Sequence, residues 1–152
     1  MINFRSIVRI LCVAVMLSLL SGCSTMMGMF WTSPTLTINL DLTSDTNGGD
    51  TLTILLVPMS RSTFLKTGYQ GAMHYVGETQ THMETLTTEQ FDEGDYSFTI
   101  PVKEGQEGVA IFVLFTQPNA ETQWKQYIPD AYGKEYYFNV ADHTINNFTG
   151  DN

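Results

Sequence analysis

The chain has 152 residues, of which 16 are acidic and seven are basic, so its formal net charge at pH 7 is −9. This balance excludes nucleic acid and anionic lipid headgroups as favourable partners and favours a basic protein surface. Two cysteines, Cys12 and Cys23, are too few for a disulfide framework, so the fold must be stabilised by burial of apolar surface.

The N-terminus has the features of a secretory signal. Arg5 and Arg9 precede "ILCVAVMLSLL" (residues 10–20), which is almost entirely apolar. A permanent transmembrane helix needs about 20 apolar residues, whereas a basic start, a short apolar core and small residues after it are typical of a signal peptide. We therefore predict a signal peptide over residues 1–22.

The step "LSGC" at Leu20–Cys23 resembles the bacterial lipobox, in which the cysteine thiol takes a diacylglycerol before the signal is removed. Acyl chains on Cys23 would make membrane attachment nearly permanent. Ser24 follows, where an aspartate would resemble an inner-membrane retention signal, so the resemblance predicts an outer-membrane anchor facing the periplasm. The alternative is a plain signal peptide with an incidental cysteine.

Removal of 22 of the 152 residues leaves 130, enough for one domain. Cys12 leaves with the signal, so no disulfide can form within the mature chain. Its net charge becomes −11, from five basic residues against 16 acidic ones.

Residues 23–34 have no charged side chain and no regular period, and we interpret them as a lipidated tether. Five apolar side chains of this tether lie either in the membrane interface or against the domain, and the sequence leaves both open. They are Met26, Met27, Met29, Phe30 and Trp31.

A β-domain is expected over residues 35–152. "TLTINLDLT" (Thr35–Thr43) alternates without a fault between apolar and polar residues, as a half-buried strand does. "DTNGGD" (Asp45–Asp50) is rich in turn formers, and "TLTILLVPM" (Thr51–Met59) is a second strand. We expect these two strands to form a hairpin.

Further short strands follow along the chain. "VAIFVLF" (Val109–Phe115) is apolar on both faces, which predicts a central, covered strand. Short strands separated by frequent turns indicate an all-β sandwich or barrel. The other expected strands are Asp95–Val102, Thr122–Ile128, Lys134–Val140 and His143–Thr149.

The alternation disappears between Ser60 and Phe91. Phe64, Leu65, Tyr69 and Met73 come close to helical spacing, and "TLTTEQF" (Thr85–Phe91) contains the residues that cap a helical turn. We therefore expect an excursion with short helices lying against the sandwich.

The sequence offers little for covalent chemistry. It contains no nucleophile elbow, phosphate-binding loop or Cys–His pair. His74 and His82 lie near Glu78 and Glu84 but without zinc-type spacing, so exposed histidines are preferred to a metal site. We expect no enzymatic activity, no metal and no cofactor.

The order of these parts resembles the outer-membrane lipoprotein of the type VI secretion system, the TssJ/SciN-like family. In that family a linker phenylalanine follows the second strand, and an apolar strand ending in Phe precedes a Trp by about nine residues. Phe64, Phe115 and Trp124 match these positions. The chain departs from the family pattern in "LLVPM", where an Arg and a Tyr-Gln are frequent, and at Lys125, where an Arg is frequent.

The resemblance implies a transthyretin-like β-sandwich with a short helical excursion. It also implies a function: holding the periplasmic domain of a large inner-membrane secretion protein at the outer membrane. A periplasmic ligand-binding or inhibitor lipoprotein on a sandwich scaffold is the alternative.

In that family, the loop between the first two strands contacts the partner. The resemblance therefore implies a docking site at the corresponding loop of this chain. The alternative is an ordinary surface turn. The candidate docking residues are Asp45, Thr46, Asn47, Gly48, Gly49 and Asp50.

Overall fold

The structure is a computed structural model that describes residues 33–118 and 122–147. The predicted signal peptide (1–22), the lipidation site Cys23 and the tether up to residue 32 lie outside the described residues. Among those described, no helix has the length and apolar character needed to cross a membrane.

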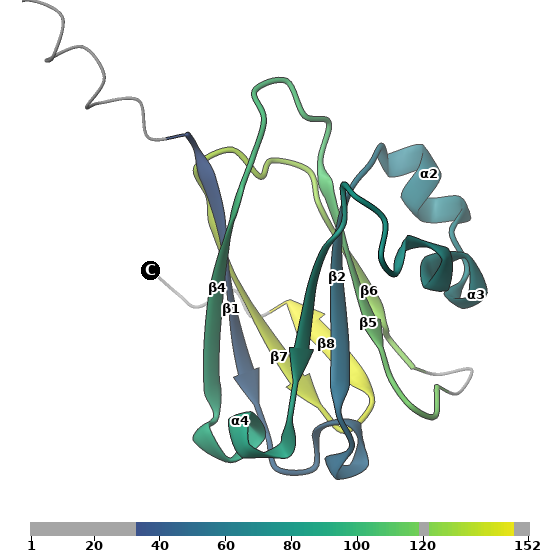
Figure 1. The fold of residues 1–152 in the computed structure, drawn as a ribbon, viewed down its shortest axis with the longest axis vertical. Helices are drawn as coiled ribbons and strands as arrows, with labels where there is room; N and C mark the ends of the chain where they lie inside the picture. Colours follow the sequence, from purple (N-terminus) through teal and green to yellow (C-terminus); the bar gives the residue numbers. More distant parts are fainter. Residues whose placement is uncertain (1–32, 119–121, 148–152) are drawn as a thin grey trace, which may run out of the picture. The chain divides into compact units, whose positions relative to one another are not determined.

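The described chain forms two four-stranded sheets (Figure 1). The first sheet has the order β4 (Asp95–Pro101), β1 (Thr35–Leu42), β7 (Glu135–Ala141) and β8 (Thr144–Asn147). The second has the order β3 (His82–Leu86), β2 (Leu52–Pro58), β5 (Val109–Leu114) and β6 (Lys125–Ile128). The predicted fold class, an all-β sandwich with a short helical excursion, is confirmed.

The predicted hairpin between the first two strands is wrong. β1 pairs antiparallel with β4 and parallel with β7, whereas β2 pairs antiparallel with β3 and β5. The two strands lie in different sheets, so the loop between them crosses from one sheet to the other. Local alternation and turn residues are the same for a hairpin and for such a crossing, because both place one face of each strand in the core.

The core lies between the sheets and is built from the alternate side chains that the sequence predicted. Leu36, Ile38 and Leu40 of β1 are essentially inaccessible to solvent. They pack against apolar side chains of the second sheet, including Ile54 and Ile111. Burial of these side chains supplies the main stabilisation of a domain without disulfides.

The prediction that Val109–Phe115 forms a central, covered strand is confirmed. β5 lies between β2 and β6, and Val109, Ile111 and Val113 belong to the main core. Ala110 and Phe112, on the opposite face, belong to a second apolar cluster outside the sandwich. Both faces are therefore buried.

Short helices produce this second cluster, as the sequence predicted. α2 (Arg61–Lys66), α3 (Tyr69–Ala72) and η2 (Met73–Tyr75) lie on the outer side of the second sheet (Figure 1). Ser60 caps α2 by accepting a hydrogen bond from the Thr63 amide, at 3.2 Å. The ring of Phe64 stacks on Phe112, with the ring centroids 6.2 Å apart.

The same region contains one predicted element, α4, and one strand, β3, that was not predicted. α4 (Thr88–Glu93) begins with a capping box formed by Thr87 and Gln90, in the segment expected to start a helical turn. β3 was missed, because His82 and Glu84 occupy half-buried positions where an apolar residue is expected. They bond to each other, with 2.6 Å between Nε2 and Oε1, and so satisfy their polar groups at the sheet edge.

Candidate functional site

Several connections meet at the end of the sandwich where β1 ends, which we call the loop end. These are the β1–β2 connection with η1 (Thr46–Gly49), the helix α4, the start of the β5–β6 connection and the β7–β8 turn (Figure 1). The Leu42 amide donates to the Gly94 carbonyl at 2.7 Å, which ties the end of β1 to the chain following α4. Strands from both sheets therefore hold these loops in place.

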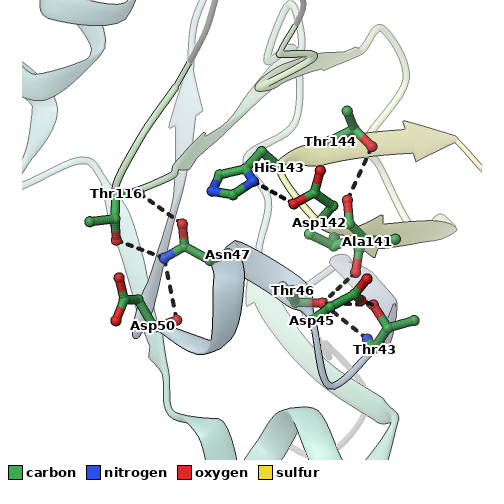
Figure 2. A network of polar contacts seen from close by, with 11 residues as sticks. Thr43, Asp45, Thr46, Asn47, Asp50, Thr116, Ala141, Asp142, His143 and Thr144 are labelled. Atoms are coloured by element: carbon green, nitrogen blue, oxygen red, sulfur yellow. Dashed lines mark hydrogen bonds and ion pairs between the residues drawn. The ribbon is translucent and has the colours of Figure 1, made fainter.

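Asn47 connects three of these segments (Figure 2). Its side-chain Nδ2 donates to the Thr51 carbonyl at 2.8 Å and to Thr116 Oγ1 at 3.0 Å, and its Oδ1 accepts from the Thr116 amide at 2.8 Å. Its own amide donates to the Asp142 carbonyl. One buried asparagine thus joins the β1–β2 loop to the end of β5 through its side chain and to the β7–β8 turn through its backbone amide.

Thr46 supports the same loop from the first sheet. Its hydroxyl donates to the Val140 carbonyl of β7 at 2.7 Å and accepts from the Thr43 amide at 3.0 Å. The exposed fraction is 0% for Thr46 and 1% for Asn47, so neither side chain faces solvent. Buried polar groups with all partners present fix a single loop conformation.

The backbone of η1 requires the residues found there. Asn47, Gly48 and Gly49 have φ values of 54°, 63° and 81°, in the left-handed region. Glycine adopts this region without penalty, and asparagine does so more readily than other side chains. The run "NGG" was recognised as a turn signal, but a turn signal does not reveal that the Asn side chain points inward.

The candidate docking residues therefore divide into two groups. Asp45, Gly48 and Asp50 are exposed and Gly49 is half-buried, so these residues present the surface of the loop. Thr46 and Asn47 hold the loop in shape from beneath. Docking at this loop stays a prediction, and among its members only the first group offers side chains or backbone to another molecule.

The loop end is strongly acidic. Among the lysines and arginines of residues 33–118 and 122–147, Arg61 and Lys66 belong to α2, and Lys103 and Lys134 lie at the opposite end of the strands. Lys125 starts β6, but its ammonium is bound to the Phe64 and Thr67 carbonyls of the helical excursion. The exposed carboxylates at the loop end are Asp45, Asp50, Glu89, Asp92, Glu93 and Asp142. A protein surface of opposite charge is attracted to such an end and oriented by it.

His143 adds the one imidazole ring at this end within the described ranges. Its Nδ1 lies 2.6 Å from Asp142 Oδ1, and its ring packs on Phe115 with the centroids 5.7 Å apart. The side chain is 23% exposed. It is thus held by its neighbours, with an edge left in contact with solvent.

Two of the three positions that carry the sequence resemblance, Phe64 and Trp124, meet at the helical excursion, whereas Phe115 belongs to the main core. Phe64 and Trp124 both stack on Phe112, and Lys125 Nζ lies 4.8 Å from the Phe64 ring centroid. The Lys125 ammonium donates to the Thr67 carbonyl at 2.8 Å, at the C-terminal end of α2. Burial lowers the pKa of Lys125 below its ordinary value. Trp124 is half-buried between the sheet and Tyr69.

The histidines singled out in the sequence lie apart from each other. Among the described residues no group of three or more His, Cys, Asp or Glu side chains could hold a metal ion. His74 is exposed and bonds to the Gln70 carbonyl, and His82 bonds to Glu84, so the two histidines do not come together. What the loop end offers is a rigid, acidic, solvent-facing surface.

Comparison with solved structures gives three informative similarities. The Serratia marcescens Lip structure, a membrane-bound component of the type VI secretion system, matches with a TM-score of 0.62 and 10% sequence identity, over 80% of this chain and 100% of that one. The type VI lipoprotein TssJ1 from Pseudomonas aeruginosa matches with a TM-score of 0.58 and 12% identity, over 80% of this chain and 99% of that one. The chain shares the fold of type VI secretion lipoproteins.

A chain from a structure of the T6SS protein TssM C-terminal domain (869-1107) from EAEC also matches, with a TM-score of 0.64 and 11% identity, over 77% of this chain and 99% of that one. No family model and no curated protein matched the sequence. At this level of identity the similarities establish the fold, and the role must be argued from the surface of this chain.

Proposed function

We propose that this protein is an outer-membrane lipoprotein, anchored through Cys23 and facing the periplasm, that docks the large inner-membrane component of a type VI secretion membrane complex. The observation that carries the proposal is the rigid acidic loop end on a fold shared with type VI secretion lipoproteins. The protein acts as a structural docking protein and not as an enzyme.

The direction of β1 suits this role. The chain enters the domain at Thr35 and reaches the loop end after the eight residues of β1, about 23 Å further on. An anchor at Cys23 is joined covalently to the Thr35 end. The loop end is thus the end of β1 opposite to the one at which the chain from Cys23 enters the strand.

The bonding of Thr46 and Asn47 also suits docking. A loop that is already fixed in its bound conformation loses little conformational entropy on association. The exposed Asp45 and Asp50 then act as carboxylates of fixed position, and Gly48 leaves room for a partner backbone. A partner with lysine or arginine side chains matches this surface.

The test is capture of the partner from detergent-solubilised membranes by the full chain, followed by mass spectrometry. The variant Asp45→Lys with Asp50→Lys reverses two carboxylates on the loop without touching the buried Asn47. The control, Glu104→Lys with Glu107→Lys, makes the same charge change in the β4–β5 connection at the other end of the strands.

We expect the loop variant to lose at least tenfold of the captured inner-membrane protein while its circular dichroism stays native. The control variant should capture as the wild type does. Equal capture by both variants would remove the loop end as the docking site, and absence of an inner-membrane secretion protein from the wild-type capture would remove the proposed function.

A ligand-binding lipoprotein is the second candidate, and a hollow beside the helical excursion favours it. This hollow, of about 580 Å³, lies between the end of β2 and the excursion and is lined by residues that include Val57, His74 and Tyr75. A thermal-shift screen of periplasmic metabolites distinguishes the two: a stabilising ligand whose effect is lost in Tyr75→Ala would favour this candidate.

A further inference from the structure

The outer face of the first sheet is not covered by the described helices. The excursion helices α2 and α3 lie on the other sheet, and Figure 1 shows no described helix over this face. The outward side chains of β4, β1 and β7 form rows across the strands, because register partners point to the same side. One row contains Asp95, Asp41 and Asn139, and the next contains Ser97, Asn39 and Tyr137.

Asp41 and Asp95 are direct register partners on adjacent antiparallel strands. Like charges in directly opposite positions destabilise a sheet. Asp41 receives one hydrogen bond, from Asn139 Nδ2 at 3.0 Å. For the Asp95 carboxylate no hydrogen bond or ion pair with another described residue is found, and no Lys or Arg projects from the outward positions of these three strands. The pair therefore lacks the cation that would offset its repulsion.

A shallow hollow of about 430 Å³ lies beside this pair. Its lining includes Asn39, Ser97 and Tyr137 as well as the two aspartates, and the small side chain of Ser97 leaves space between its larger neighbours. Tyr137 is 47% exposed, and its hydroxyl donates to Glu135 Oε1 at 3.0 Å, which holds the phenol in place. The hollow thus has carboxylates at one side and a fixed aromatic ring at the other.

We propose that this hollow, which we call the sheet-face groove, binds an arginine side chain presented by a segment of the protein partner. A guanidinium pairs with carboxylates through its planar set of N–H donors and also stacks on an aromatic ring. Its charge supplies the cation that Asp41 and Asp95 lack, and the ring of Tyr137 adds a cation–π contact. The proposal rests on the proposed function, since it describes a second contact of the same docking partner.

The position of the groove supports a continuous interface. Asp41 is the second-last residue of β1 and Asp95 is the first residue of β4, so both border the loop end. A partner that covers the acidic loops can extend along the sheet face without leaving acidic surface. Phosphate-bearing partners, such as nucleic acid or anionic lipid, are repelled by the same carboxylates.

The first test does not depend on the partner. The full chain, labelled with nitrogen-15 and held in non-ionic detergent, is titrated with N-acetylarginine methylamide and followed by amide chemical shifts. N-acetylglycine methylamide at matched ionic strength is the blank. The variants are Asp95→Asn, Tyr137→Leu and, as a matched control on another surface, Glu107→Gln.

We expect the shifts to concentrate at Asn39, Ser97 and Tyr137, and to weaken with added salt. Asp95→Asn should lower the apparent affinity about tenfold, Tyr137→Leu about fivefold, and Glu107→Gln should leave it unchanged. Shifts spread evenly over all exposed carboxylates, or shifts that persist unchanged in Asp95→Asn, would overturn the groove.

The second test uses the capture of the inner-membrane protein by Asp41→Asn with Asp95→Asn. A fall of about tenfold supports the groove. Capture unchanged by this variant but lost in Asp45→Lys with Asp50→Lys overturns the groove and leaves the proposed function intact. If neither the wild type nor any variant captures the inner-membrane protein, but the arginine derivative still binds in the titration, the proposed function is removed and the arginine site remains.

A second copy of the chain is the competing occupant, because its Arg61 is exposed. Sedimentation of the full chain decides this. A concentration-dependent dimer that disappears in Asp95→Asn would overturn the proposal that a different protein supplies the arginine.

Discussion

Replacement of Asn47 by alanine tests the view that a buried amide fixes the shape of the docking loop. The substitution removes three side-chain hydrogen bonds of 2.8 to 3.0 Å, to the Thr51 carbonyl and to the amide and hydroxyl of Thr116. At about 1 kcal/mol for each bond, their loss costs about 3 kcal/mol. Alanine must also adopt the φ of 54°, at a cost of about 1 kcal/mol.

Asn47→Ala should therefore lower the free energy of unfolding by about 4 kcal/mol, a large part of the about 5–15 kcal/mol typical of a domain. The assay is urea denaturation followed by circular dichroism. Asn47→Gly separates the two contributions, because glycine removes the hydrogen bonds but tolerates the backbone conformation.

Asn146→Ala is the matched control, since Asn146 is an exposed asparagine of β8. It should change the free energy of unfolding by no more than about 0.5 kcal/mol. If Asn47→Ala cost less than about 1 kcal/mol, the loop would not depend on this side chain and the argument for a preorganised docking surface would be wrong.

Three further predictions concern the core, the pH dependence and the anchor. Phe112→Ala should cost about 3–5 kcal/mol in the same urea assay, because this fully buried ring stacks with three others; a cost below about 1 kcal/mol would contradict central placement of β5. Burial raises the pKa of Tyr69, and the hydroxyl of this residue donates to the Phe115 carbonyl at 2.6 Å. The stabilisation by the protonated hydroxyl is therefore present below about pH 10 and is lost as pH rises through the raised pKa. Tyr69→Phe should lower the free energy of unfolding by about 1 kcal/mol at pH 7 and give a shallower loss of stability at alkaline pH. An alkaline stability profile identical to that of the wild type would contradict a stabilising role of the Tyr69 hydroxyl. Cys23→Ser should abolish palmitate labelling and outer-membrane sedimentation; a variant that stays in that membrane after a high-salt wash would exclude lipidation as the anchor.

Local patterns in the sequence predicted most of the strands, because side chains alternate on a half-buried strand whatever its partners are. β1, β4 and β5 begin at their predicted residues, and each ends within one residue of its predicted end. Pairing could not be predicted in the same way. Whether β1 pairs with β2 or with β4 is decided by contacts between distant segments, which the residues of either strand do not reveal.

The loop between β1 and β2 was predicted in position but not in construction. The excess of turn-forming residues in "DTNGGD" located the loop, and its aspartates indicated a basic partner. The inward direction of Asn47 depends on Thr116, 69 residues further along the chain, so it became apparent only with the fold. The Asp41–Asp95 pair was likewise hidden, because it arises from the register between β1 and β4.

The central claim is that the loop end faces the inner-membrane protein in the assembled envelope. Site-specific photo-crosslinking in cells tests it most directly, with benzoylphenylalanine placed at Asp50 on the loop end or at Glu104 at the opposite end of the strands in the full, lipidated chain. We expect a crosslink from position 50 to the large inner-membrane secretion protein and none from position 104. A crosslink from position 104 without one from position 50 would contradict it.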